Sequence, residues 1–235
     1  MRNFDRYMVG GLREFVKAHS PVPDGRDGWP ARNLQQRQSI FFGSGLPRTM
    51  AASGEDQQYV KTSTGDFVFK KAHVHGSQNL YLKGKSIIMP GAIIRGEIQA
   101  IRIGRYCFIG EDTVIRPAYR IEQEDSNLKC RFTPLSVGNH TYIGKSCVVE
   151  SAGIGCNVRI EDGCVLGRNS FVRDNCHLLA GTVLPEGAVV PPFTVLQGCP
   201  AKMVSVLHES TASVWTEDAV NFYETFDPSA VASTA

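Results

Sequence analysis

Residues 154–201 read, in blocks of six, IGCNVR IEDGCV LGRNSF VRDNCH LLAGTV LPEGAV VPPFTV LQGCPA. Every block begins with an aliphatic residue, and the residue four places later is small or compact. These two positions lie two residues apart across the block junction, as in Cys164-Val165-Leu166, so a strand points both to the same face. Each block is therefore a short strand followed by a corner, and Gly155 and Gly167 mark corners where the backbone bends at little steric cost. A period of six sustained this long predicts a parallel β-helix.

The six-residue period extends upstream with interruptions. The earlier runs are Val137, Ile143 and Val149; Ile103, Ile109 and Ile115; and, with weaker residues, Val74, Leu80, Ser86, Ala92 and Ile98. We therefore expect one all-β solenoid domain over residues 59–205. The regular hexads resemble the left-handed β-helix family, in which three hexads make one triangular coil, and the left hand is implied by this resemblance.

Three segments of the chain interrupt or follow the repeat. Residues 116–136 form a polar insertion, which we expect to loop outward from a corner because its side chains cannot enter the core. Tyr59–Phe69 alternates as an entry hairpin with its turn at Thr64-Gly65-Asp66. The region 206–226 predicts a C-terminal α-helix that packs back along the solenoid or caps its last coil, followed by a tail over 227–235. Its apolar stripe is formed by Val214, Trp215, Phe222 and Phe226.

The first 58 residues lie outside the repeat and are rich in Arg and Lys but poor in acids. Several Pro and Gly break any long helix, so we expect a basic, disordered N-terminal extension over 1–58. An organelle transit peptide has the same composition, and an upstream-extended reading frame with its start at Met50 is a further alternative.

Composition narrows the class of protein. The sequence is 42% hydrophobic and holds 23 Gly, enough for a core and for many corners. A net charge of +2 and the lack of a long apolar run predict neither nucleic-acid binding nor membrane insertion. Four of the seven Cys (Cys107, Cys147, Cys164 and Cys176) occupy small interior positions, which indicates buried small side chains in a reducing compartment. No Cys-x-x-Cys pair suggests a zinc site.

One enzyme hypothesis is a γ-class carbonic anhydrase. The stretches Ile94-Arg95-Gly96-Glu97 and Ile101-Arg102-Ile103-Gly104 resemble that family, which binds zinc through three His. The corresponding positions here hold Arg116, Lys145 and Glu150. Two cations have no lone pair to donate at neutral pH, so we expect no metal and no cofactor, and these three residues instead suggest an ion-paired remnant of the pocket.

The other enzyme hypothesis is a hexapeptide acyltransferase, which needs a His general base that faces a cleft. The candidates by residue type are His73, His75, His140 and His177. His140 and His177 fall at positions that point away from the core, where a surface role without a partner is expected. Both enzyme classes predict a homotrimer.

A third resemblance concerns assembly rather than catalysis. It rests on Gly76-Ser77-Gln78-Asn79, Ile93-Ile94-Arg95-Gly96-Glu97, Val114-Ile115-Arg116-Pro117, Leu184-Pro185, Val189-Val190-Pro191-Pro192-Phe193-Thr194-Val195 and Gly198-Cys199-Pro200. Over residues 59–226 the chain resembles the dynactin subunit 5 family of the dynactin pointed-end complex. The N-terminal extension and the 116–136 insertion depart from the family pattern.

The dynactin resemblance implies a non-catalytic, cytoplasmic and cytoskeleton-associated subunit of a hetero-oligomer. The implied partners are dynactin subunit 6, an actin-related protein of the pointed end and cargo adaptors of dynein. Arginines cluster around the insertion, and Arg suits bidentate contacts with carboxylates. We therefore expect Arg95, Arg116 and Arg120, with Arg102 and Arg105 beside them, to contribute to a partner-binding surface. The alternative is that they only pair with Glu97, Glu111 and Glu150.

Overall fold

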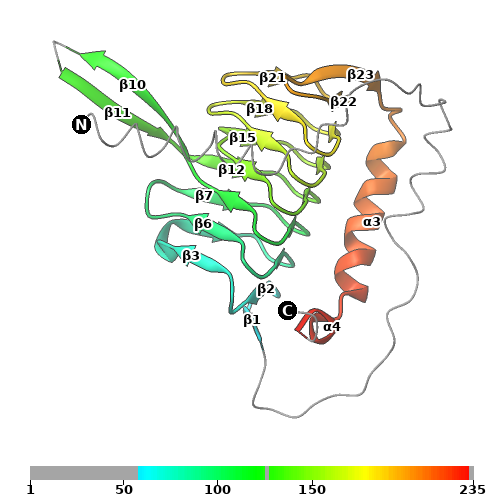
Figure 1. Cartoon of the computed structure of the whole chain (residues 1–235). Helices are drawn as coiled ribbons and strands as arrows, with labels where there is room; N and C mark the ends of the chain where they lie inside the picture. The colour runs from blue at the N-terminus through cyan, green and yellow to red at the C-terminus, as the bar shows by residue number, and fades with distance from the viewer. Residues whose placement is uncertain (1–57, 125–126, 233–235) are drawn as a thin grey trace. The chain divides into compact units, whose positions relative to one another are not determined.

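The chain folds into a left-handed β-solenoid whose short strands stack into three sheets, with one long helix along a flank (Figure 1). The computed structural model describes residues 58–124 and 127–232. The extension predicted over 1–58 therefore lies, except for its last residue, outside the described residues. The predicted fold class, a solenoid of hexapeptide repeats with a C-terminal α-helix, is confirmed.

Consecutive strands of the regular coils fall in different sheets, so each sheet takes every third of these strands. Sheet A contains, in spatial order, β1 (Tyr59–Lys61), β2 (Phe67–Phe69), β5 (Ile87–Ile88), β8 (Phe108–Ile109), β13 (Tyr142–Ile143), β16 (Arg159–Ile160), β19 (His177–Leu178), β22 (Thr194–Gln197) and β23 (Lys202–Val206). Sheet B contains β3 (His73–His75), β6 (Ile93–Arg95), β9 (Val114–Ile115), β14 (Val148–Val149), β17 (Val165–Leu166) and β20 (Val183–Leu184). Sheet C contains β4 (Leu80–Leu82), β7 (Ile101–Ile103), β12 (Leu135–Val137), β15 (Gly153–Ile154), β18 (Phe171–Val172) and β21 (Val189–Val190).

The aliphatic residue of each hexad forms the core. Val149, Leu166 and Leu184 stack in register on three successive coils of sheet B, and at most 3% of each is exposed. Pairing within the sheets is parallel, apart from β1 with β2 and β22 with β23. The hexads therefore bury one continuous apolar column along the solenoid axis.

The small interior positions carry hydrogen bonds as well as filling space. Thr113 Oγ1 donates to the Gly144 carbonyl at 2.7 Å, and the Cys147 thiol donates to the Glu161 carbonyl at 3.2 Å. Ser86, Cys107, Thr141, Cys164 and Cys176 make the same kind of bond to a corner carbonyl of the following coil, whereas the Thr182 hydroxyl donates at 2.5 Å to the Leu179 carbonyl of its own coil. Burial raises the pKa of the Cys107 thiol to about 12. The Cys107 thiol is therefore a protonated donor within the fold.

Substitutions of Thr113 test whether these hydrogen bonds between coils stabilise the fold. Thr113→Val keeps the shape of the side chain but removes the donor to Gly144 and the acceptor for the Cys147 N–H, which lies 3.2 Å away. We expect a loss of about 1–3 kcal/mol in the free energy of unfolding, because buried polar groups are left without partners. Thr113→Ser keeps the hydroxyl and should cost clearly less. A Thr113→Val variant that unfolds in urea at the same concentration as the parent would show that the hydroxyl contributes only volume.

The glycines that follow the aliphatic residue of a hexad were expected to let the backbone bend, but the structure requires glycine there for a different reason. A Cβ on Gly167 would lie 2.6 Å from the Leu184 carbonyl oxygen, and one on Gly155 would lie 2.3 Å from an Asp174 carboxylate oxygen. Glycine is needed there for close approach between coils. The left-handed backbone falls two residues later, at Asn157 and Asn169, each with φ of 54°, and Asn tolerates this region better than most residues.

The expected register was wrong in the first coils. Ser86 and Ala92 occupy the small positions, while Ile88 and Ile94 are the large core residues, and all four are fully buried. The cause is a 3-10 turn at Ser77–Asn79, which adds residues between strands β3 and β4 so that a strict count of six slips. Ile98 lies outside the buried core.

The insertion is an antiparallel hairpin of two seven-residue strands, β10 (Ala118–Glu124) and β11 (Asn127–Thr133), which projects from the solenoid (Figure 1). Its predicted limits were too wide, because Leu135 and Ser136 belong to β12 and pair with β7. Arg116 likewise continues the solenoid, since its N–H donates to the Val149 carbonyl at 3.0 Å. The sequence predicted an outward loop, and in the structure this segment forms a two-stranded antiparallel hairpin.

The C-terminal segment packs along sheet A. The helix α3 (Thr211–Thr225) buries Trp215, while Val214 is 48% exposed, so the predicted place of Val214 in the apolar stripe was wrong. The expected tail contains a short helix, α4 (Pro228–Ala232). An aromatic cluster joins the last turns of α3 to the entry hairpin and consists of Tyr59, Phe67, Phe69, Phe108, Phe222, Tyr223 and Phe226. The helix therefore covers the flank of sheet A from β19 back to the entry hairpin and does not cap the last coil.

Candidate functional site

The positions compared with zinc ligands hold an ion pair at one corner of the solenoid. Arg116 pairs with the Glu150 carboxylate, and Arg168 Nε lies 3.6 Å from the other oxygen of that carboxylate. Only 7% of the Glu150 side chain is exposed. Guanidinium groups have no lone pair for a metal, and the carboxylate is already held between two of them. This corner is therefore built to neutralise charge rather than to coordinate zinc.

Lys145 does not join this ion pair. Its Nζ lies 2.8 Å from Glu111 Oε2 on a different corner, and the hydrogen bond to Glu111 raises the pKa of Lys145. The expectation of a three-residue ionic remnant was therefore wrong for Lys145. Within residues 58–124 and 127–232, no cluster of three His, Cys, Asp or Glu side chains has a geometry suited to a metal ion.

The candidate arginines divide between corners. Arg95 and Arg116 directly follow residues that pair in register on β6 and β9, so they stand on the same corner, and the hairpin that carries Arg120 leaves from it. Arg95 Nε pairs with Glu97 Oε1 at 2.7 Å. Arg102 belongs instead to sheet C, where its guanidinium lies 5.7 Å from the Tyr81 ring centroid, and Arg105 lies on the following corner. The structure thus puts Arg95 and Arg116 on one corner, places Arg120 on the hairpin beside the later coils, and separates Arg102 and Arg105 from all three.

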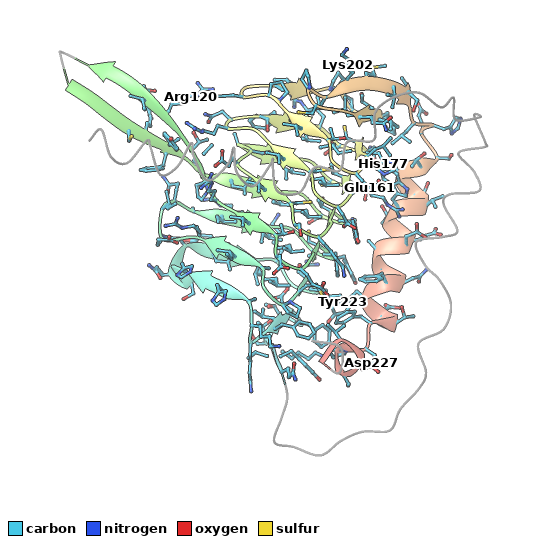
Figure 2. All side chains as sticks on the ribbon, viewed as in Figure 1. Arg120, Glu161, His177, Lys202, Tyr223 and Asp227 are labelled. Carbon is cyan, nitrogen blue, oxygen red and sulfur yellow. The ribbon has the colours of Figure 1, made fainter. Side chains whose placement is uncertain are left out.

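His177 is held in a cluster beneath α3. Its Nε2 lies 2.9 Å from Glu161 Oε1, and its ring meets Trp215 edge to face at 5.7 Å (Figure 2). Arg159 stacks on the same indole at 4.7 Å and pairs with Asp218 at 2.7 Å. His177 was expected to have no partner, which was wrong. These contacts fix the helix to the sheet and leave His177 facing a packed helix rather than a substrate cleft.

Among the described residues, the other three candidate histidines (His73, His75 and His140) have no hydrogen bond to a carboxylate that would orient a general base, although His73 lines a shallow cavity with Glu111, Asp112 and Lys145. His73 and His75 are exposed on β3. His140 stacks on the Tyr106 ring at a centroid distance of 5.5 Å, and partial burial lowers its pKa. General-base catalysis needs a reactive group held toward a substrate, and the contacts of His140 are those of a corner residue.

A groove at the root of the hairpin was not foreseen from the sequence. Its walls are Tyr119, Arg120, Ile121 and Glu122 of β10 and Arg168, Asn169, Glu186 and Gly187 of the solenoid corners. The Arg168 guanidinium lies 4.4 Å from the Tyr119 ring centroid. Gly167 repeats the position of Glu150 one coil later, and Arg168 and Asn169 follow it on the same corner. The repeat therefore predicts that Arg168 and Asn169 lie near Arg116 once the root of the hairpin has been placed.

The comparisons with known proteins agree with the fold. Residues 53–231 match the sequence profile of the family described as dynactin subunit 5. The chain belongs to the dynactin subunit 5 family. A protein of Dictyostelium discoideum named dynactin subunit 5 is 35% identical over 179 residues, which is 76% of this chain and 88% of that protein.

Two further similarities are more distant. Gamma carbonic anhydrase 2, a mitochondrial protein of Arabidopsis thaliana, is 25% identical over 66% of this chain and 53% of its own length. The crystal structure of a hexapeptide transferase family protein from Anaplasma phagocytophilum aligns with a TM-score of 0.50 and 20% identity, covering 65% of this chain and 89% of that one. This second likeness shows the shared solenoid fold alone.

Proposed function

We propose that this protein is a non-catalytic subunit of the dynactin pointed-end complex and acts there as an assembly and docking module. Its partners in this proposal are dynactin subunit 6 and an actin-related protein, and the complex links cytoplasmic dynein to cargo adaptors. The observation that carries the non-catalytic part is the Arg116–Glu150 pair, which occupies the corner where the resemblance to γ-carbonic anhydrases places zinc ligands. Membership of the dynactin subunit 5 family supports the complex.

The same proposal places the protein in the cytoplasm on the dynein and dynactin machinery. Among residues 58–124 and 127–232 there is no helix with the length and apolar character needed to cross a bilayer. The partner-binding role of Arg95, Arg116 and Arg120 remains part of this proposal. Arg95 and Arg116 are paired with Glu97 and Glu150, and Arg120 forms no ion pair with another described residue, so Arg120 contributes the most accessible charge.

Co-assembly tests the proposed complex. The last coils expose apolar side chains on β21 and β23, with Val189 at 64%, Met203 at 59% and Val206 at 65%. A solenoid end of this kind is normally covered by a partner. Expressed alone, the protein should self-associate, whereas co-expression with dynactin subunit 6 and the pointed-end actin-related protein should yield a soluble complex of fixed stoichiometry by native mass spectrometry. A monodisperse homotrimer that ignores these partners would contradict the proposal.

Metal content tests the competing function, that of a γ-carbonic anhydrase. This alternative is considered because gamma carbonic anhydrase 2 of Arabidopsis thaliana is a distant relative of the chain. The purified protein should hold far less than one zinc per chain and should not accelerate the hydration of carbon dioxide, since Arg116 and Lys145 replace lone-pair donors. Inductively coupled plasma mass spectrometry and stopped-flow assays measure the two quantities. Stoichiometric zinc that is lost in Glu150→Ala would contradict the non-catalytic assignment.

A further inference from the structure

One face of the β10–β11 hairpin is apolar and exposed. The register pairs Tyr119 with Phe132 and Ile121 with Cys130, and strand alternation puts these four side chains on the same face. Ile121 is 51% exposed and Phe132 is 40% exposed. An isolated two-stranded ribbon is only marginally stable in water. The hairpin therefore presents an apolar surface that a further strand would extend and partly cover.

The opposite face of the hairpin carries an excess of positive charge. Arg120 and Arg131 lie directly opposite one another in the register, and like charges so placed destabilise a strand pair. Among the side chains that the structure describes, the neighbouring acid in contact is Glu122, whose carboxylate lies 3.7 Å from Arg131, in a pair whose Arg131 and Glu122 side chains are 76% and 52% exposed. Such an exposed pair contributes little. A carboxylate placed beside Arg120 would relieve this repulsion.

The groove at the hairpin root lies along the edge of β10. Four consecutive β10 residues, Tyr119 to Glu122, line this space of about 540 Å³, and none of the described residues of β11 does. Consecutive residues alternate between the two faces of a strand, so a wall made of all four is the strand edge. The edge of β10 away from β11 therefore borders the groove, with the solenoid corners as the opposite wall.

A hydrogen bond indicates which backbone groups face the groove. Asn169 Nδ2, from the solenoid corner, donates to the Tyr119 carbonyl at 3.4 Å. In an antiparallel ladder, residues alternate between pairing with the partner strand and pointing outward. Tyr119 and Ile121 therefore direct their N–H and C=O groups away from β11, while Arg120 and Glu122 pair with it. Ile121 offers a donor and an acceptor to an incoming strand.

We propose that the groove edge of β10 binds an extended segment of a partner protein as an added strand, and that this segment alternates acidic and apolar residues. Backbone hydrogen bonds to Ile121 would supply affinity, as in strand addition generally. Alternation would place apolar side chains beside Tyr119 and Ile121, and acidic side chains beside Arg120. This inference deepens the proposed docking function and rests on it for the identity of the biological partner.

A defined peptide tests the groove directly. The probe is acetyl-Glu-Val-Glu-Ile-Glu-Val-Glu-amide, the control replaces each Glu with Lys, and binding to the full chain is measured by fluorescence anisotropy with a labelled probe. Ile121→Pro removes the outward N–H but leaves the β10–β11 ladder bonds, because proline is tolerated at an edge whose N–H faces away from the ladder. It should weaken the acidic probe by about ten-fold or more, while Ile121→Val should bind as the parent does.

A second variant avoids any effect on the backbone. Arg120→Glu should weaken the acidic probe by about ten-fold and strengthen the lysine probe, because it reverses the charge next to the added strand. Hydrogen exchange should show the Ile121 amide protected when the acidic probe is bound. Equal affinity of the parent, Ile121→Pro and Arg120→Glu, or no saturable binding of the acidic probe, would overturn the proposed groove.

The reconstituted pointed-end complex separates the two proposals. Assembly by the parent chain, with loss of one subunit in Ile121→Pro, supports the groove. Assembly that is unchanged in Ile121→Pro, together with no peptide binding, overturns the groove and leaves the proposed function standing. Failure of the parent to assemble overturns the proposed function, and the peptide titration still decides the groove. Self-association that Ile121→Pro abolishes would assign the edge to a second copy of this chain and overturn the partner segment.

Discussion

Replacing Leu166 with aspartate is expected to abolish cooperative folding of the solenoid. Leu166 is fully buried on β17, between Val149 on the preceding coil and Leu184 on the following one. A carboxylate there would have no hydrogen-bond partner, and burying an unpaired charged or polar group costs several kcal/mol. A domain of ordinary stability has about 5–15 kcal/mol in total, so most of the folded population should be lost.

Circular dichroism on heating and in urea measures the effect of Leu166→Asp. The matched control is Val189→Asp, which introduces the same side chain on another strand of the solenoid where 64% of the residue is exposed. This control should change the free energy of unfolding by less than about 1 kcal/mol. A cooperative transition in Leu166→Asp near that of the parent would mean that the column of aliphatic residues does not hold the coils together.

The sequence predicted the core of the later coils well because a strict repeat makes each coil a copy of the one before it. Once Leu166 is assigned to the interior, the same assignment follows for Leu178 and Leu184. The same assignment failed in the first coils. The turn at Ser77–Asn79 adds residues there, and the pattern of aliphatic residues in the sequence shows no gap that would reveal them. Periodicity specifies which residues face inward only while no corner changes length.

The candidate site was harder to predict for a different physical reason. Arg116 and Glu150 lie on two corners that stack in register, and this stacking brings the two side chains together. The resemblance to γ-carbonic anhydrases had already placed both residues at zinc-ligand positions. Arg168 entered the same network from the next coil, and Asn169 reached Tyr119 only because the insertion formed a hairpin. The period of six carries no information on the path of an insertion, so the groove at its root was not predictable from the repeat.

Removing the carboxylate from the Arg116–Glu150–Arg168 corner is the second change with a large expected effect. Glu150→Leu removes the Glu150 carboxylate from the Arg116 guanidinium, whose side chain is 16% exposed, and leaves that guanidinium close to a second one, that of Arg168. Breaking a buried ion pair from one side typically costs about 3–5 kcal/mol, because the remaining charge is desolvated and uncompensated. The reverse change, Arg116→Met, leaves Glu150 with Arg168 at 3.6 Å and should cost less.

The double variant Arg116→Met with Glu150→Leu distinguishes this account from simple loss of packing. If the penalty of Glu150→Leu comes from an uncompensated charge, removing Arg116 as well should restore part of the stability, and the double variant should unfold at a higher urea concentration than Glu150→Leu alone. If the losses of stability in Arg116→Met and Glu150→Leu simply add in the double variant, packing holds the corner together and the ion pair contributes little. Arg116 directly precedes the hairpin, so the same series should also change binding of the acidic peptide if this ion pair sets the position of the β10 edge.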